Sequence, residues 1–204
     1  MKYNVICADP PWNFSDPLVM SGVKRGAISQ YRTLNLNDIK NLDVSSIAED
    51  DAVLILWVPS SMLQDGLDVM KSWGFAQKQT YIWVKIKKNL KLPKIKYINE
   101  ILAFFMGRLF RQTHEIALIG TKGKIYSKLQ NRSQRSVVLD VNLKHSAKPE
   151  GLQDSLDIMF PSPHNTKVEL FARRSRPGWD CVGLECPDSL DEDIRDSIER
   201  LKNK

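Results

Sequence analysis

The sequence predicts a single α/β domain in which a mostly parallel sheet carries helices on both faces. Residues 52–58 form a continuous apolar run, which is typical of a parallel strand that is buried on both sides. Serines follow this run, and apolar residues at helical spacing then indicate a helix over residues 62–73. The length of 204 residues suits one such domain.

The composition is that of a soluble globular protein, with 42% hydrophobic and 26% charged residues. No apolar run approaches the length that crosses a membrane, and the first predicted strand leaves no room for a signal peptide. Cys7, Cys181 and Cys186 lack the spacing of a zinc site. We therefore expect a cytoplasmic protein with reduced cysteines, no metal and no membrane partner.

The charge balance is basic, with a formal net charge of +6 and a pI of about 9.2. Residues 188–204 hold six acids and four bases, so residues 1–187 carry 26 Lys and Arg against 18 Asp and Glu. This excess favours a polyanionic partner such as nucleic acid. Charge alone does not decide the matter, because many soluble domains are mildly basic.

The first predicted strand, residues 3–8, ends in Asp9-Pro10-Pro11-Trp12. The two prolines fix φ and remove two backbone donors, and an ionised Asp9 can only accept hydrogen bonds. Together they present a rigid pair of acceptors to a planar amine, while Trp12 offers a flat surface on which a ring can stack. The exocyclic amine of adenine fits this description. For these four residues alone, the alternative is an ordinary strand-to-loop turn.

Asp9-Pro10-Pro11-Trp12 resembles the DPPW motif of the MT-A70 family of adenine-N6 methyltransferases, and further family segments follow in order up to about residue 186. The resemblance implies S-adenosylmethionine as cofactor and nucleic acid as substrate. It also implies a Rossmann-like sheet with the permuted motif order of the β-class, in which the catalytic strand comes first and the cofactor strand comes near the end.

Residues 13–35 show no regular period and are expected to form a loop. The loop ends in Tyr31-Arg32-Thr33-Leu34, which is similar to a family segment that precedes a short helix, here near residues 35–40. Tyr31 either lines the pocket for the target base or packs to hold the loop. Trp57 lies in a segment like the family's Leu-Trp-Val. We expect its side chain to pack in the core, with a place in the wall of the pocket as the second alternative.

Residues 81–85 form the next predicted strand and resemble the family's Trp-Val-Lys, which places Lys85 at the strand's carboxyl end. Six lysines then occur within residues 85–96. The family carries a variable, substrate-facing insert here, so we expect Lys85, Lys87 and Lys88 to contact nucleic acid. An edge hairpin with its lysines turned outward is the alternative.

An apolar and aromatic stretch, residues 100–110, leads to a strand over residues 116–121. Relatives have a Gly-aromatic segment that ends in Glu at the start of this strand, which makes Glu115 a candidate pocket residue. Arg111 resembles an arginine of bacterial members and is a candidate for substrate binding. A second basic loop, residues 122–135, precedes a short strand over residues 137–141.

Residues 144–150 resemble the family's His-Ser-x-Lys-Pro-Glu. Lys148 precedes a predicted helix that starts at Pro149 and runs to about Phe160. A fixed lysine beside helix donors can bind a carboxylate, here that of S-adenosylmethionine.

The last family segments are residues 168–174 and 177–183, which resemble Glu-Leu-Phe-Ala-Arg and a Pro-x-Trp loop with its strand. The resemblance places Phe171 and Arg173 against the adenosine of the cofactor. Relatives continue with Gly-Asn-Glu or Gly-Asn-Gln, whereas this chain has Leu184 in place of the Asn. Glu185 would then bind the ribose hydroxyls alone.

Residues 1–187 are expected to form the methyltransferase domain, and residues 188–204 an amphipathic C-terminal helix of the same domain. The alternatives are that this helix packs on its own domain or on a partner subunit. The protein could therefore form a homodimer, or a heterodimer with a related subunit.

The predicted catalytic residues are Asp9, Pro10, Pro11 and Trp12, with Asp9 also next to the cofactor. Asp9 and the Pro10 carbonyl would each accept one N6–H of adenine and so direct the nitrogen lone pair toward the methyl donor. DNA is favoured over RNA, because the chain resembles bacterial and phage members and lacks an RNA-binding appendage. An RNA methyltransferase and a non-catalytic nucleic-acid-binding subunit are the alternatives.

Overall fold

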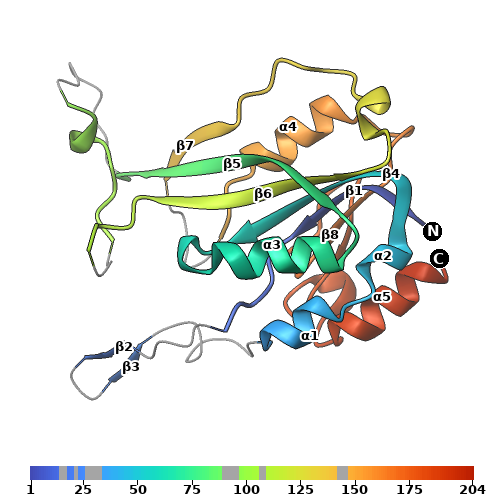
Figure 1. The fold of residues 1–204 in the computed structure, drawn as a ribbon, viewed down its shortest axis with the longest axis horizontal. Helices are drawn as coiled ribbons and strands as arrows, with labels where there is room; N and C mark the ends of the chain where they lie inside the picture. Colours follow the sequence, from blue (N-terminus) through green and yellow to red (C-terminus); the bar gives the residue numbers. More distant parts are fainter. Residues whose placement is uncertain (14–17, 21–22, 26–33, 89–96, 106–108, 142–146) are drawn as a thin grey trace.

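The structure, a computed structural model, describes residues 1–13, 18–20, 23–25, 34–88, 97–105, 109–141 and 147–204. A seven-stranded sheet with the order β7-β5-β6-β4-β1-β8-β9 runs through the molecule (Figure 1). Its strands are β1 (Tyr3–Ala8), β4 (Ala48–Val58), β5 (Ala76–Ile86), β6 (His114–Lys122), β7 (Val137–Val141), β8 (Lys167–Leu170) and β9 (Asp180–Val182). A separate antiparallel pair, β2 (Leu18–Met20) and β3 (Val23–Arg25), occurs where the sequence predicts only loop.

Most neighbouring strands are parallel, as predicted. Parallel pairs join β1 to β4 and β8, β8 to β9, and β5 to β7. Strand β6 is the exception and runs antiparallel to both β4 and β5. Because of this reversal, the first residues of β6 lie at the edge of the sheet where β4 and β5 end: Glu115 is paired with Trp83, and Ile116 with Val58.

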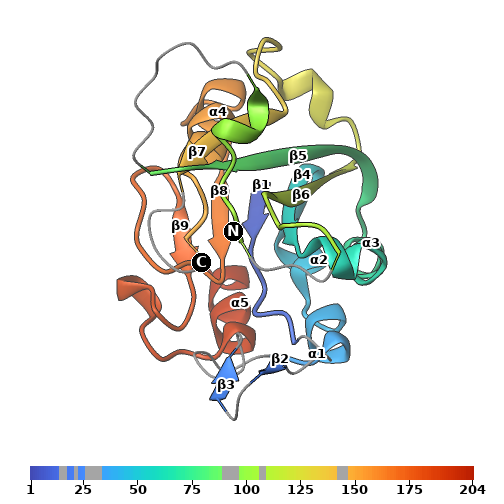
Figure 2. The same cartoon turned by 90° about the vertical axis from the view of Figure 1, so that its left-hand side faces the viewer.

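Helices cover both faces of the sheet (Figures 1 and 2). One face carries α1 (Leu36–Lys40), α2 (Val44–Ile47), α3 (Leu63–Ser72) and α5 (Ile194–Lys202), and the other carries α4 (Gly151–Met159). Short 3₁₀ turns complete the described elements: η2 (Ser60–Met62), η3 (Ile98–Glu100), η4 (Ile125–Lys128) and η5 (Pro187–Ser189).

The apolar run in β4 is continuous because its alternate side chains enter two separate cores. Leu54 and Leu56 pack in the cluster that includes Trp73 after α3. Val53 and Ile55 pack in the cluster that includes Leu156 of α4. The prediction of a strand buried on both faces is therefore confirmed.

Two predicted helices differ in detail from the structure. The serines after β4 form the 3₁₀ turn η2, and the helix predicted over residues 62–73 is α3, which begins at the exposed Leu63. In the C-terminal segment, α5 begins only at Ile194, so Leu190 is also exposed. The helix itself packs on the same chain, since Ile198 and Leu201 lie in the core with α2.

The two ends of the chain lie side by side, because the ammonium group of Met1 donates to the carbonyl of Leu201 at 3.1 Å (Figure 1). All three cysteines are unpaired and buried. Within the described ranges, no helix combines the length and the apolar character needed to cross a bilayer.

Replacing Gly66 with Ala is expected to destabilise the protein by about 1–3 kcal/mol, because the added methyl group would have to enter a filled core. A Cβ at this position of α3 would lie 2.5 Å from Cγ2 of Val58, a buried residue of β4. Urea unfolding measures the change in the free energy of unfolding.

The matched control is Gly151→Ala in α4, where the nearest atom to a new Cβ is Cγ2 of Val138 at 3.7 Å. This change adds helix propensity without a clash and should keep or slightly raise the free energy of unfolding. A Gly66→Ala protein as stable as the Gly151→Ala protein would contradict the packing described for α3.

Candidate active site

Charged side chains from several elements meet at the edge of the sheet where β1, β4 and β5 end. Asp9 directly follows β1, and Lys85 is the penultimate residue of β5. Glu115 reaches the same edge because β6 starts there. Lys148, which precedes α4, completes the group. Four residues that the sequence predicts as site residues are thus brought together.

These four residues form a row of alternating charge, Asp9–Lys148–Glu115–Lys85, which we call the acid–base row. The ammonium nitrogen of Lys148 lies 2.6 Å from Oδ2 of Asp9 and 3.4 Å from Oε2 of Glu115. The ammonium nitrogen of Lys85 lies 2.5 Å from Oε1 of Glu115. The side chains are 11–26% exposed, so water screens the row only partly.

The row stabilises the charged forms of its central residues. Burial alone would raise the pKa of Glu115, but the charges of Lys148 and Lys85 outweigh it and hold this pKa below its ordinary value. Burial would likewise lower the pKa of Lys148, but Asp9 and Glu115 outweigh it and raise this pKa. Both residues therefore stay charged at neutral pH.

Backbone hydrogen bonds hold the Asp-Pro-Pro-Trp turn. The carbonyl of Pro10 accepts the N–H of Trp12 at 2.8 Å, and the carbonyl of Pro11 accepts the N–H of Leu34 at 3.1 Å. Each carbonyl has two lone pairs, so the Pro10 oxygen keeps one for a ligand. The turn therefore still offers the two acceptors predicted from the sequence, Asp9 and the Pro10 carbonyl.

The structure corrects the prediction for Trp12. Only 4% of this side chain is exposed, because it packs in the core and its indole N–H donates to the carbonyl of Trp57 at 2.9 Å. Trp12 therefore joins the ends of β1 and β4 and has no open face on which a ring can stack. Trp57 is also a core residue, as expected, and the ammonium of Lys148 lies 5.6 Å from the centre of its ring.

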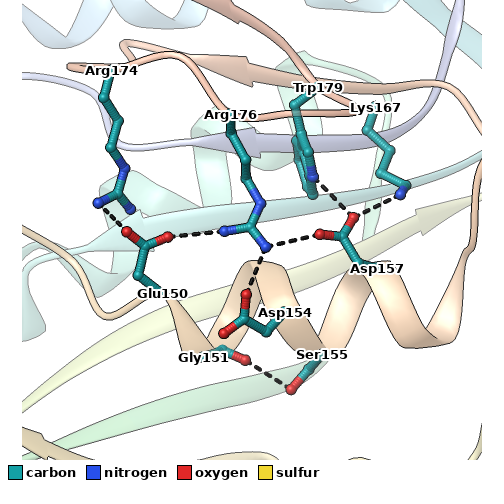
Figure 3. Close-up of polar contacts among 9 residues, drawn as sticks. All are labelled: Glu150, Gly151, Asp154, Ser155, Asp157, Lys167, Arg174, Arg176 and Trp179. Carbon is teal, nitrogen blue, oxygen red and sulfur yellow. Dashed lines mark hydrogen bonds and ion pairs between the residues drawn. The ribbon is translucent and has the colours of Figure 1, made fainter.

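Lys148 is held in place through α4, and Figure 3 shows how this helix is fixed to the chain after β8. The guanidinium of Arg176 donates to Glu150 at 2.8 Å, to Asp154 at 2.6 Å and to Asp157 at 2.8 Å. Arg174 pairs with Glu150 as well. Glu150 stands at the start of α4, two residues after Lys148. Arg176 thus links this end of the helix to the segment after β8, the strand that the sequence predicts to bind the cofactor.

Sequence reasoning missed Arg176, although acids at 150, 154 and 157 fall on one face of a helix and could have indicated a cationic partner. The helix itself begins at Gly151, two residues later than predicted, with Glu150 as its N-cap. Pro149 therefore precedes the helix and does not occupy its first position.

The carboxyl end of β8 lies beside Asp9, because Ala8 pairs with Leu170 in the parallel register of β1 and β8. Phe171 follows β8 with φ of 63°, a conformation that costs a bulky residue about 1–3 kcal/mol and is typical of functional sites. Gly183 packs so closely on this turn that a Cβ would lie 2.3 Å from the carbonyl oxygen of Ala172.

The other predicted cofactor residues lie near one another after β8 and β9. Nε of Arg173 is 3.7 Å from Oε1 of Glu185. Leu184 is exposed, and its side chain supplies no amide.

Glu169 in β8 is a further residue that sequence reasoning missed. Among the described residues, its buried Oε2 atom has no hydrogen-bond partner. Burial, with a smaller effect from Asp9, raises the pKa of Glu169 to about 7. A glutamate between the apolar residues Val168 and Leu170 of a buried strand is the signal that could have identified it.

The remaining predicted substrate residues lie outside the acid–base row. The ammonium of Lys87 donates to the carbonyl of Glu100 at 2.8 Å, and Lys88 is exposed. The guanidinium of Arg111 lies 4.6 Å from the centre of the Phe104 ring. Tyr31 falls outside the described residues. The described part of the chain shows no group of three or more His, Cys, Asp or Glu that could hold a metal ion.

Comparison with known proteins agrees with the motifs. The model of the MT-A70 family matches residues 3–185. The type II methyltransferase M.MunI of Mycoplasma is 32% identical over 203 residues, which covers 92% of this chain and 79% of that protein.

The human N(6)-adenosine-methyltransferase catalytic subunit is 26% identical over 207 residues, and the match covers 100% of this chain but only 31% of the human protein. An MT-A70-like N(6)-adenosine-methyltransferase of Drosophila melanogaster is 26% identical over 184 residues, which is 26% of its length. The chain thus spans less than a third of these two proteins. Since one family model matches most of its length, the chain belongs to the MT-A70 family of adenine-N6 methyltransferases.

Proposed function

We propose that this protein transfers a methyl group from S-adenosylmethionine to the N6 amine of adenine in DNA. The observation that carries the proposal is the position of Asp9, whose carboxylate is held by Lys148 beside the Pro10 carbonyl at the end of β1. DNA is favoured because the chain covers most of a type II methyltransferase, a class that acts on DNA, but less than a third of the human N(6)-adenosine-methyltransferase subunit.

Asp9 and Pro10 act on the target nitrogen by accepting its two N–H groups. The lone pair of N6 is delocalised into the adenine ring, and two fixed acceptors favour a geometry in which it points at the methyl donor. As the methyl group transfers, positive charge develops on the nitrogen, and these acceptors stabilise it more than they stabilise the ground state. Among the described contacts, Lys148 uses Oδ2 of Asp9, so Oδ1 is available to the amine.

The residues after β1, β8 and β9 fit S-adenosylmethionine, which supplies an electrophilic methyl group on its sulfonium. The buried oxygen of Glu169, which has no partner in the described part of the chain, suits the α-ammonium of an amino acid, and Lys148 suits its α-carboxylate. Phe171, Arg173 and Glu185 would hold the adenosine portion. Strand β8 lies next to β1 although it comes much later in the chain, which supports the Rossmann-like sheet with the permuted β-class order.

The domain assignment rests on the C-terminal helix. We assign residues 1–187 to the methyltransferase domain and residues 188–204 to a helix of the same domain, supported by the packing of Ile198 and Leu201 in its core. The buried, unpaired cysteines support a reducing, cytoplasmic setting.

Replacing Asp9 with Ala should reduce kcat for methyl transfer by at least about a hundredfold, because one aimed acceptor is lost where charge develops. Asp9→Asn keeps an acceptor oxygen but loses the charge, so its rate should lie between those of Asp9→Ala and wild type. Transfer from labelled S-adenosylmethionine to adenine-containing DNA, with RNA of the same sequence in parallel, measures both variants.

Nucleic-acid binding and thermal unfolding provide the control for folding in this experiment. Near wild-type turnover by a folded Asp9→Ala protein would refute the assignment of Asp9. A wild-type protein that is not stabilised by S-adenosylmethionine or its product would instead be a non-catalytic binding subunit.

The affinity for S-adenosylmethionine should increase as pH rises toward neutrality. Glu169 has a folded-state pKa of about 7 against an ordinary value of 4.5, so below pH 7 it is mostly protonated and cannot pair with the ammonium group. Affinity should therefore fall by up to about tenfold per pH unit below 7. Calorimetric titration at several pH values measures this slope.

The same raised pKa predicts that the free energy of unfolding, measured without cofactor, decreases as pH rises from about 4.5 to about 7, since the folded state then binds the proton more tightly than the unfolded state. Glu169→Gln should weaken cofactor binding and flatten both pH profiles. A Glu169→Gln protein with the wild-type slopes would remove Glu169 from the cofactor site.

A further inference from the structure

Beyond the end of β5, the chain presents a group of exposed aromatic side chains. The exposed fraction is 61% for Tyr97, 74% for Phe104 and 87% for Phe110. Together with the partly exposed Phe105, these residues form what we call the aromatic lobe. Exposed apolar groups of this size commonly mark a binding surface.

The aromatic lobe is built on hydrogen-bonded backbone. The N–H of Ala103 donates to the carbonyl of Lys85 at 2.8 Å, and the N–H of Lys87 donates to the carbonyl of Ile101 at 3.0 Å. Phe105 and Gln112 form an antiparallel bridge. The rings are therefore presented from a backbone tied to the end of β5, which lowers the entropy cost of binding to them.

Cations lie among these rings. The guanidinium of Arg111 lies 4.6 Å from the centre of Phe104, and the ammonium of Lys85 lies 5.1 Å from the centre of Phe105. Among the described residues of the segment 85–114, four cations stand against one acid: Lys85, Lys87, Lys88 and Arg111 against Glu100. The described part of this surface thus combines aromatic faces with an excess of positive charge.

The aromatic lobe also adjoins the acid–base row. Lys85 contacts Phe105 and forms the ion pair with Glu115, which in turn contacts Lys148. A ligand on the lobe would therefore lie next to the group that holds Asp9.

We propose that the aromatic lobe binds an unpaired nucleic-acid strand next to the target adenine. Unpaired bases expose their faces for stacking on Phe104 and Phe110, whereas bases in a duplex are covered by their neighbours, and cations such as Lys87 interact with the phosphates. The inference rests on the proposed function for its nucleic-acid substrate and extends it by naming the form of the strand.

Charge argues against a second copy of this chain as the occupant of the lobe. In a symmetric dimer the same surface would face itself, and two surfaces whose described residues each carry an excess of positive charge would be brought together. A polyanion is the complementary partner.

The test compares Phe104→Ala/Phe110→Ala with Leu109→Ala, a matched control because Leu109 is 92% exposed but has no π-face. Fluorescence anisotropy with labelled single-stranded and duplex DNA of one sequence, without cofactor, measures binding independently of methyl transfer. The aromatic variant should bind the single strand at least about fivefold more weakly, the low end of the stacking contribution of one base. The duplex affinity, and both affinities of Leu109→Ala, should stay near wild type.

A second pair of variants tests the charge. Lys87→Ala/Lys88→Ala should reduce the dependence of single-strand affinity on salt concentration. Lys124→Ala/Lys128→Ala removes the same charge beyond the other end of β6 and should leave this dependence unchanged.

Wild-type affinity in the aromatic variant, or an equal loss in Leu109→Ala, would overturn the proposal. A wild-type dimer that the aromatic substitutions convert to a monomer, seen by light scattering, would also overturn it and assign the lobe to contact between copies. Failure of the proposed function has a different signature, because wild-type protein would then bind the strand without methylating adenine.

Discussion

The ammonium group of Lys148, shared between Asp9 and Glu115, is the interaction on which the site depends. Three features of the fold are needed to form it: Asp9 at the end of β1, an antiparallel β6 that starts at that edge, and α4 placed so that the residue before it reaches across. Partly buried charges are costly unless they are paired. Alternation of charge along the acid–base row offsets that cost and holds the Asp9 carboxylate beside the Pro10 carbonyl.

In the proposed function, the same lysine would connect substrate chemistry to cofactor binding. It contacts the carboxylate that would accept the amine, and it stands before a helix that Arg176 fixes to the chain after β8. In the proposed function, Asp9 and Glu169 are carboxyl groups with separate tasks. Lys148 pairs with Asp9, whereas burial raises the pKa of Glu169 to about 7. Their different environments follow from the sheet, in which β1 and β8 are neighbours.

Much of this arrangement is predictable from local sequence, and the failures have physical causes. Strand β1 and strand β7 match their predicted ranges, because short apolar runs bounded by turn residues are read locally. The motifs identify Asp9, Glu115 and Lys148 as site residues. Their ion pairs join residues far apart in the chain, so the local motifs cannot predict which of them pair. The motif predicts Trp12 as a platform for stacking a ring, whereas in the structure its indole N–H has a partner and the ring lies in the core. Tyr31 stays a prediction.

A double-mutant cycle on the free energy of unfolding, built from Asp9→Asn, Lys148→Met and the double variant, tests the central claim most directly. Lys148→Met keeps the length of the side chain and removes its charge. If Lys148 holds Asp9 as described, the double variant should lose less stability than the sum of the single variants, with a coupling energy of about 0.5–3 kcal/mol. Effects that add to within about 0.3 kcal/mol would show that the two residues act independently and would contradict the account.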